Sequence, residues 1–442
     1  MMKWKKLGID LTGVLIALPV AAAAFAGSFY GHVPANEFED ERPYARAMPV
    51  DSVCPRIDFA VDSLCRIVDA SHSLDAFLDE LEMLLAGKDT VVNVVHLGDS
   101  HVQAGFYSGQ IMRMLQETFG NAGRGWISPL KLAKSNEPKD YFITSSIREW
   151  EIGRCIQKDP LCPLGPGGMG IRTPSDDVDF AIRISPVNGA GYTFNRLVMY
   201  RDSGAAPMLP SCGDSLSVDV CWGDGTDVVA DTFRIAGETD GIHLHAGRRE
   251  SPATNCYYGF SLSNGRPGIL YHAVGQNGAM FANYSRPEYV RRLAALKPSL
   301  LIITLGTNES FVPESRFHPE RFVLQMDSFV RLVKHILPGT AILITTPAES
   351  FRRVRKRHER NRNILKVATA ICEYAGSEGI ACFDMYGATG GVNSCEKWKK
   401  ANLLGRDRIH YSIDGYCEQG KLLYKSLIRL KLNQPHETYG GD

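Results

Sequence analysis

The most constraining stretch of the sequence is an apolar run that ends in a tight turn. Residues 91–97 are rich in valine, and Gly98, Asp99 and Ser100 follow at once. A short apolar run bounded by turn residues is typical of a buried strand in a parallel sheet. Apolar residues at helical spacing follow at 110–119. The sequence therefore predicts a strand, a turn and a helix, which is the unit from which α/β folds are built.

Ser100 occupies a position that suits catalysis. Open α/β sheets bind their ligands at the carboxyl ends of the strands, and N–H groups at a helix N-terminus favour negative charge. Ser100 is therefore a candidate nucleophile. The alternative is purely structural, because an aspartate or serine before a helix commonly serves as its N-cap. That second interpretation suits Asp99 well.

The second half of the chain alternates strands with helices. Strands alternating with helices of ordinary length indicate a parallel sheet that is covered by helices on both faces. Strands are expected at 268–274, 300–305, 341–345 and 380–384, and helices at 289–296, 322–337, 363–375 and 413–430, with one further helix at 74–85 before the first strand.

Residues 125–265 differ in character from the flanking segments. Gly, Pro, Ser and Asp are frequent there, and the apolar residues form short alternating runs such as Phe180–Ile184. Short strands with frequent turns are typical of a β-sandwich. We therefore predict an inserted β-rich domain at 125–265, between two parts of the α/β core at 86–124 and 266–435.

The N-terminus has the features of a secretory signal. Three lysines within the first six residues precede an apolar stretch that ends at Ala26. Because a membrane-spanning helix needs about 20 apolar residues, this shorter stretch predicts a signal peptide at 1–26 and no stable membrane span after its cleavage. An uncleaved anchor is the alternative. Residues 27–85 are predicted to be a linker followed by a helix, and the remaining chain to be periplasmic or secreted.

The overall charge gives no indication of a polyanionic partner. The chain has 49 basic and 49 acidic residues, so nucleic acid is not an expected ligand. One run, Arg352 to Arg362, is strongly basic. Because it leads into a helical pattern, we interpret it as the solvated start of a helix, with contact to an anionic polymer as the alternative.

Eleven cysteines in an exported chain permit disulfides, although spacing does not fix their connectivity and the odd number leaves at least one free thiol. No Cys-x-x-Cys pair occurs in the sequence, and His243 and His245 have no third ligand nearby. Neither a metal nor another cofactor is therefore predicted. The candidate disulfide pairs, chosen for their closeness in sequence, are Cys54–Cys65, Cys155–Cys162, Cys212–Cys221 and Cys372–Cys382.

A nucleophilic serine needs a base, a residue that orients the base, and hydrogen-bond donors for the oxyanion. Candidates for all three stand at strand or helix ends. Gly-Gln-Asn-Gly at 275–278 follows the second predicted strand, and Gly-Thr-Asn-Glu at 306–309 follows the third. Asp407 and His410 precede the last helix. Their spacing lets a carboxylate hold one imidazole nitrogen while the other nitrogen faces Ser100.

These segments resemble the four conserved blocks of the SGNH (GDSL-type) hydrolases, a family of esterases. The resemblance implies a flavodoxin-like, three-layer α/β/α sheet with an inserted β-sandwich. It also implies Ser100 as nucleophile, His410 as base and Asp407 as the orienting partner. The oxyanion hole would consist of the backbone N–H groups of Ser100 and Gly278 and the side chain of Asn308.

Further residues adjoin the implied catalytic groups. Glu309 stands where the third block of the family more often has aspartate. His101 adjoins Ser100, but side chains of neighbouring helical residues diverge by about 100°, so His101 is not expected to act as the base. It is expected either to support the triad or face the substrate, or to be a plain turn residue. Either Gly275 or Gly278 could supply the oxyanion N–H. Gly278 is preferred because the family's second block ends in a small residue followed by glycine.

The Gly-Asp-Ser-His sequence, the long insertion and the predicted export are similar to the peptidoglycan O-acetylesterase branch of the family, in which the insertion resembles a carbohydrate-binding module. The resemblance implies an exported serine esterase that removes O-acetyl groups from a polysaccharide partner through an acyl-enzyme. One alternative is an O-acetyltransferase that uses the same triad on a cell-envelope glycan. Another is a non-catalytic glycan-binding protein, which the presence of all three triad residues disfavours.

Overall fold

The computed structural model describes residues 59–185, 192–211, 216–246, 255–355 and 357–432. The predicted signal peptide at 1–26, the linker up to residue 58, and the cysteines at 54 and 212 lie outside the described residues. Within these ranges, no helix combines the length and the apolar character that a membrane crossing requires.

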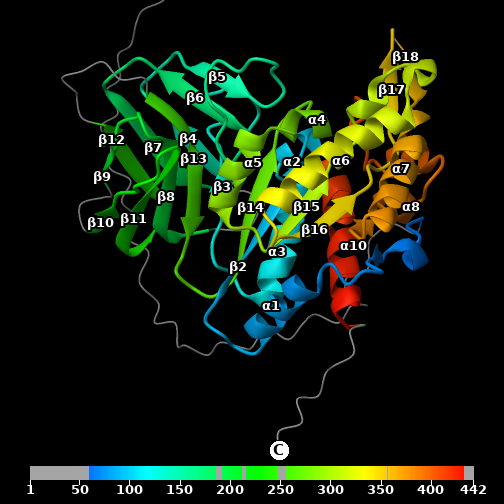
Figure 1. Cartoon of the computed structure of the whole chain (residues 1–442), viewed down its shortest axis with the longest axis horizontal. Helices are drawn as coiled ribbons and strands as arrows, with labels where there is room; N and C mark the ends of the chain where they lie inside the picture. Colours follow the sequence, from blue (N-terminus) through cyan, green and yellow to red (C-terminus); the bar gives the residue numbers. More distant parts are fainter. Residues whose placement is uncertain (1–58, 186–191, 212–215, 247–254, 356, 433–442) are drawn as a thin grey trace, which may run out of the picture. The chain divides into compact units, whose positions relative to one another are not determined.

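A six-stranded sheet forms the centre of the α/β part (Figure 1). Its spatial order is β1-β19-β16-β15-β2-β14, and all neighbouring strands are parallel except β1, which is antiparallel to β19. In chain order the parallel strands are arranged 2-1-3-4-5, which is the flavodoxin-like order and confirms the predicted fold class. The strands are β1 (Ile67–Val68), β2 (Val91–Gly98), β14 (Gly268–Gly275), β15 (Leu300–Thr304), β16 (Ala341–Thr345) and β19 (Ala381–Phe383).

Helices cover both faces of this sheet because successive side chains of a strand point to opposite faces. Val92 and Val94 of β2 belong to one buried cluster, and Val95 and Leu97 belong to the other. The first cluster includes residues of α1 (Asp75–Leu85), α3 (Tyr107–Phe119) and α10 (Ile413–Leu432), and the second includes residues of α5 (Pro287–Leu293), α6 (Pro319–Ile336) and α7 (Asn363–Ser377). Shorter helices are α2 (Ser100–Gln103), α4 (Phe281–Tyr284), α8 (Met385–Ala388) and α9 (Ser394–Lys400), and the 3₁₀ turns are η2 (Asp62–Leu64), η3 (Ala294–Leu296), η4 (Glu309–Phe311) and η5 (Glu314–Arg316).

The strands from β3 to β13 form two antiparallel sheets, in agreement with the predicted β-rich insertion. The ring of Phe180 lies 5.2 Å from that of Tyr257 and 5.4 Å from that of Phe260, so the two sheets share an aromatic core. One sheet contains β10 (Val218–Cys221), β11 (Val228–Thr239), β8 (Phe194–Asp202), β13 (Asn255–Ser263), β6 (Met169–Thr173) and β5 (Glu151–Arg154), with β3 (Gly125–Ile127) also paired to β13. The other contains β4 (Tyr141–Thr144), β7 (Val178–Ile184), β12 (Gly241–Ala246) and β9 (Leu209–Ser211).

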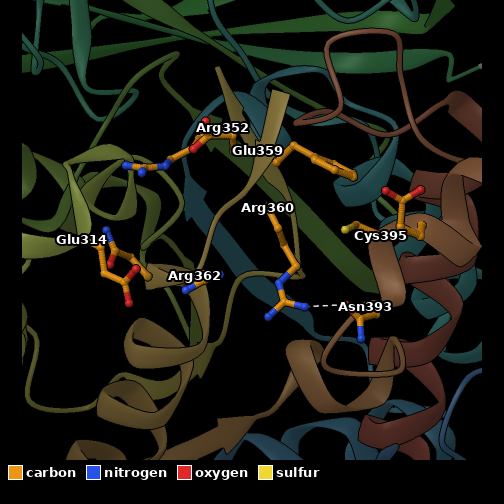
Figure 2. Close-up of a pocket in the computed structure, with 10 residues that line it drawn as sticks. Glu314, Arg352, Glu359, Arg360, Arg362, Asn393 and Cys395 are labelled. Atoms are coloured by element: carbon orange, nitrogen blue, oxygen red, sulfur yellow. Dashed lines mark hydrogen bonds between the residues drawn. The ribbon is translucent and has the colours of Figure 1, made fainter. Parts of the chain in front are cut away.

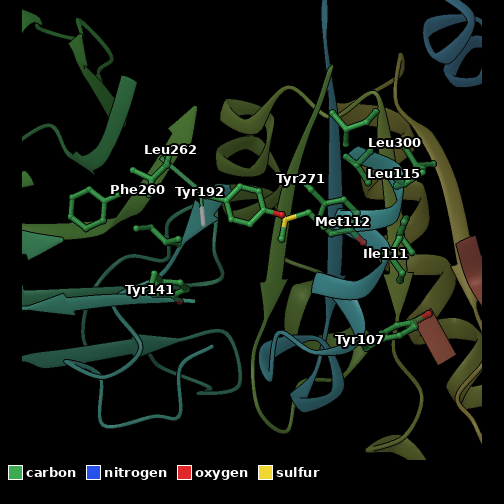
Figure 3. Packing of buried hydrophobic residues seen from close by; sticks show 14 of the residues in the cluster. Tyr107, Ile111, Met112, Leu115, Tyr141, Tyr192, Phe260, Leu262, Tyr271 and Leu300 are labelled. Carbon is green, nitrogen blue, oxygen red and sulfur yellow. The ribbon is translucent and has the colours of Figure 1, made fainter. Parts of the chain in front are cut away.

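The β-rich sheets and the α/β part share one hydrophobic core (Figure 3). Leu262 of β13, Tyr192, Met112 of α3 and Tyr271 of β14 all belong to the same buried cluster. The Tyr192 hydroxyl also donates to Oε1 of Gln116 on α3 at 2.8 Å. The insertion is therefore packed into the α/β part through side chains and is not merely connected to it by the chain.

The basic run from Arg352 to Arg362 differs from the prediction. Instead of starting a helix, it forms a hairpin of β17 (Phe351–Val354) and β18 (Arg357–Arg360) that precedes α7. The buried Phe351 anchors the first strand, because its N–H donates to the carbonyl oxygen of Arg408 at 2.9 Å. Like charges three or four residues apart repel in a helix, whereas a hairpin directs successive side chains to opposite faces.

The described cysteines form no disulfide. The predicted pair Cys155–Cys162 is wrong, since Cys162 lies beside Cys256, a residue distant in sequence that β13 brings next to it. The predicted pair Cys372–Cys382 is adjacent, with 3.7 Å between its sulfur atoms, but both residues are free thiols in this structure.

Candidate active site

The candidate site lies where the order of the parallel strands reverses. β14 lies on one side of β2 and β15 on the other, and such a reversal leaves a crevice at the carboxyl ends of the strands. Ser100 lies two residues after Gly98, the last residue of β2, and begins the short helix α2. Asp99 is the N-cap of this helix, because its Oδ1 accepts the N–H of His101 at 2.9 Å. The helix predicted after Ser100 is thus divided into α2 and α3.

Two glycines let the strand ends approach α2. A Cβ at Gly98 would lie 2.4 Å from Cγ2 of Val102, and a Cβ at Gly275 would lie 2.1 Å from the backbone nitrogen of Gln103. Any larger residue at these two positions would push the strands away from the helix that carries Ser100. The glycines therefore fix the position of the candidate nucleophile.

The structure brings together the three predicted triad residues. Ser100 Oγ lies 2.8 Å from Nε2 of His410, although the two residues are 310 positions apart in sequence. Nδ1 of His410 lies 2.6 Å from Oδ2 of Asp407, whose Oδ1 accepts the N–H groups of Ile409 and His410 at 3.0 Å each. This is the arrangement of a nucleophile, a general base and an orienting carboxylate.

The charges of the triad are set by its hydrogen bonds. Partial burial raises the pKa of Asp407, but the bonds from His410 and from two backbone N–H groups outweigh it and hold that pKa well below its usual range. The bond to Asp407 raises the pKa of His410 above its usual value of 6.5, and the charge of Asp99 acts in the same direction. Asp407 is therefore ionised at neutral pH and fixes the Nδ1 proton of His410, which leaves Nε2 to accept the proton of Ser100.

This electrostatic arrangement predicts the pH dependence of ester hydrolysis. Only neutral His410 accepts a proton, and its raised pKa keeps the ring protonated to a higher pH than usual. We therefore expect kcat/KM for a small acetyl ester to rise with pH, with a midpoint above 6.5. The measurement is a pH–rate profile from about pH 5 to 9, with the melting temperature recorded at each pH to exclude unfolding. A midpoint below 6.5 would contradict the raised pKa.

Gly278 has the features of an oxyanion donor. Its φ is +80°, its α-carbon faces open space, and among the described residues no protein acceptor is bonded to its N–H. Gly275, in contrast, lies within β14 and is paired in register with Gly98. These observations favour Gly278 over Gly275 as the oxyanion donor, although this role stays a prediction.

Asn308 lies between two other segments of the site. Its Nδ2 donates to Oδ2 of Asp99 and to the carbonyl oxygen of Ala279, at 3.0 Å in each case. Both N–H bonds of the amide are thus engaged, so donation to an oxyanion requires Asn308 to release or share one of them. Burial raises the pKa of Asp99 to about 7, so the charge of this acceptor changes near neutral pH.

Glu309 and His101 each form a hydrogen bond that joins segments around the candidate site. Oε1 of Glu309 accepts the N–H of Phe281 at 2.8 Å, so the loop after β15 is joined to the segment that follows Gly278. Burial raises the pKa of Glu309 to about 7. Nδ1 of His101 lies 2.9 Å from the Tyr416 hydroxyl, and its ring centroid is 5.2 Å from that of His410. Burial lowers the pKa of His101 to about 3, so this ring is neutral.

Two residues that hold the site together had not been singled out from the sequence. Oε1 of Gln103 accepts the N–H of Asn277 at 2.8 Å, and its Nε2 donates to the carbonyl oxygen of Asn136 at 2.7 Å. The Tyr284 hydroxyl donates to the carbonyl oxygen of Gly98 at 2.8 Å. A polar residue one turn after Ser100 was a usable signal for Gln103, whereas no local pattern pointed to Tyr284.

Comparisons with known proteins indicate the family of this chain. Residues 213–416 match the family model of the GDSL-like lipase/acylhydrolases. This range contains Gly278, Asn308, Asp407 and His410 but not Ser100, which precedes the β-rich insertion. Comparison of the sequence with curated proteins finds no match.

Among solved structures, that of a peptidoglycan O-acetylesterase is 21% identical, with a TM-score of 0.68 over 83% of this chain and 99% of that chain. This likeness concerns the fold, including the β-rich part. Two others match with low TM-scores. They are a putative acylhydrolase from Bacteroides fragilis (19% identity, TM-score 0.30, 36% of this chain and 76% of that one) and a carbohydrate esterase family 3 protein from Talaromyces cellulolyticus (16%, 0.28, 38% and 74%).

Proposed function

Since the chain contains a domain of the SGNH (GDSL-type) hydrolase family, we propose that it is a serine esterase that removes O-acetyl groups from a polysaccharide. The observation that carries the proposal is the hydrogen-bonded chain from Ser100 through His410 to Asp407 at the carboxyl ends of the strands. The predicted signal peptide supports an activity in the periplasm or outside the cell.

The reaction proceeds through an acyl-enzyme. Ser100 Oγ attacks the acetyl carbonyl carbon while its proton passes to Nε2 of His410. Asp407 stabilises the imidazolium, and the sugar oxygen takes the proton from His410 as the ester bond breaks. Water then attacks the acetyl-Ser100 carbonyl, again with His410 as the base, and acetate leaves as Ser100 regains its proton.

A polysaccharide is the proposed substrate for two reasons. The fold likeness to a peptidoglycan O-acetylesterase extends over 83% of this chain, which is more than its α/β part. The β-rich sheets also share a hydrophobic core with the α/β part that carries Ser100, so they are held firmly on the catalytic part and offer it additional binding surface. Binding energy from parts of a polymer distant from the ester contributes to its turnover.

The test is acetate release from O-acetylated peptidoglycan and from acetylated xylan, measured side by side with the Ser100→Ala variant as the control. We expect the wild-type protein to release acetate from at least one polymer and the variant to release none above background. If neither polymer nor a small acetyl ester is hydrolysed, the esterase proposal is wrong. Transfer of acetyl groups to an added sugar without release of acetate would instead identify an O-acetyltransferase.

A further inference from the structure

A second groove lies beside the loop that carries Asp407 and His410, at the base of the β17–β18 hairpin (Figure 2). Its volume is about 590 Å³. Figure 2 shows Arg360 directed toward Asn393 across the groove, with Arg362 nearby. The charged residues of its lining are Arg352, Arg360, Arg362, Glu314, Glu359 and Glu396.

The hairpin carries a concentration of positive charge that is unusual for this chain. Residues 351–362 contain six arginines and one lysine against one glutamate, a net charge of +6, whereas the whole chain has 49 basic and 49 acidic residues. Such a cluster creates a local positive potential that attracts anions. The potential therefore comes from the hairpin, since the lining of the groove beside it has three arginines and three glutamates.

The carboxylates of the groove already have cationic neighbours. Glu314 lies 3.4 Å from Nζ of Lys366, and Glu396 lies 3.8 Å from Nζ of Lys399. Glu359 is in register with Arg352 across the hairpin. Glu314 and Glu396 are thus paired with lysines outside the hairpin and do not compensate its arginines.

Four exposed arginines, in contrast, are not paired with a carboxylate. Within the described ranges, the side chains of Arg353, Arg355, Arg357 and Arg362 form no ion pair and no hydrogen bond. A guanidinium offers paired N–H donors that match the two oxygens of a carboxylate. These four side chains are consequently free to bind carboxylates from outside the protein.

The hairpin is fixed to the loop that carries the base. The backbone bond from Phe351 reaches the carbonyl oxygen of Arg408, which lies between Asp407 and His410 in sequence. The guanidinium of Arg408 also lies over the Phe351 ring, 5.3 Å from its centroid. The base of the hairpin is therefore held against the loop that carries Asp407 and His410.

The other end of the hairpin is fixed to the loop that carries Asn308. Nδ2 of Asn361 donates to Oγ of Ser310 at 2.6 Å, and Nδ2 of Asn363 donates to the carbonyl oxygen of Ser310 at 3.0 Å. Ser310 is two residues after Asn308. The base of the hairpin therefore contacts two loops that carry residues of the candidate active site.

We infer that the groove and the arginine-rich hairpin bind carboxylate groups of an acidic glycan while one of its O-acetyl groups is cleaved at Ser100. This inference rests on the proposed function and narrows it from acetylated polysaccharides in general to those that carry carboxylates. The carboxylates come either from uronic acid rings or from peptides attached to the glycan. A neutral glycan presents only hydroxyl groups and gains nothing from the charge of the hairpin.

The test compares two variants with equal loss of charge. The hairpin variant combines Arg353→Gln, Arg357→Gln and Arg362→Gln, and the control combines Arg66→Gln, Arg291→Gln and Arg321→Gln, three exposed arginines outside the hairpin and outside the β-rich part. The substrates are acetylated polygalacturonate, with ring carboxylates, O-acetylated peptidoglycan, with peptide carboxylates, and acetylated glucomannan, with none. The readout is the ratio of kcat/KM on each acidic substrate to that on glucomannan.

We expect this ratio to fall about tenfold in the hairpin variant, mainly through KM, for the substrate whose carboxylates fit, since each exposed ion pair contributes modestly. The control variant should keep the wild-type ratio. The preference of the wild-type protein for the acidic substrate should also weaken as salt rises, because salt screens exposed charges. A ratio that is equal in the wild-type protein and the hairpin variant, for both acidic substrates, would overturn the inference and leave the proposed function standing.

Binding provides a readout that does not depend on turnover. Calorimetry with the Ser100→Ala protein measures its affinity for deacetylated polygalacturonate oligosaccharides and for peptidoglycan fragments, with and without the three hairpin substitutions. Salt-sensitive binding that the hairpin substitutions remove supports the site, even if no acetate is ever released and the proposed function fails. The absence of such binding for both ligands contradicts the inference.

Discussion

Replacement of Ser100 by alanine is expected to lower kcat on a small acetyl ester by about 10⁶-fold, the scale of loss when the nucleophile of a hydrolase triad is removed. The reason is that His410 Nε2 is bonded to this hydroxyl, and without it no acyl-enzyme forms. The oxyanion donors and the substrate contacts remain, so some acceleration over water survives. The measurement is steady-state hydrolysis of p-nitrophenyl acetate with purified protein.

The fold should survive this change. The variant loses one hydrogen bond of a partly exposed residue, which contributes about 1 kcal/mol to stability. The melting temperature is therefore expected to change by only a few degrees. Ser377→Ala is a matched control, because it removes a hydroxyl that is hydrogen-bonded at the end of α7, away from the triad. Turnover of the Ser100→Ala protein close to that of this control would end the serine-esterase proposal.

Replacement of Asp407 by asparagine is expected to lower kcat by about 10⁴-fold, as in triads whose carboxylate becomes an amide. Oδ2 of Asp407 accepts the Nδ1 proton of His410 and so leaves Nε2 free to accept a proton. An amide nitrogen in that place donates instead, which favours the tautomer with its proton on Nε2 and blocks proton transfer from Ser100.

The pH dependence of kcat distinguishes the orientation of His410 by Asp407 from a long-range effect of its charge. Because the bond to Asp407 raises the pKa of His410, the residual activity of Asp407→Asn should have its acidic midpoint at lower pH than the wild-type protein. Asp414→Asn is the control, since it removes an equal charge from an exposed residue in the first turn of α10. Equal small losses in the two variants would show that Asp407 contributes only long-range charge.

Features that depend on short segments were predictable from the sequence. The apolar run before Gly98 identifies β2, because a parallel strand buried on both faces lacks polar alternation. Asp407 and His410 lie in one loop three residues apart, so their contact depends only on the conformation of that loop. The meeting of Ser100 with His410 depends on the order of strands in the sheet, which only the family resemblance supplied.

Features that depend on distant contacts were not predictable. The basic run forms a hairpin because Phe351 is bonded to Arg408, far along the chain, and its local pattern of charges suits a helix start equally well. Cys162 meets Cys256 through the pairing of β6 with β13 rather than through closeness in sequence. Nor does any local pattern report that Tyr284 reaches Gly98.

The place of the insertion also sets the order in which the sheet can be completed during synthesis. Both neighbours of β2, which are β14 and β15, lie beyond the β-rich residues in the chain. At about 5–20 residues per second, a ribosome needs roughly 10–40 s to pass from the end of β2 to the end of β15. Until β14 has been made, β2 has both edges unpaired, and its second edge stays unpaired until β15 has been made. An unpaired apolar strand is prone to aggregate. We therefore expect the central sheet to form only after β14 and β15 have been made.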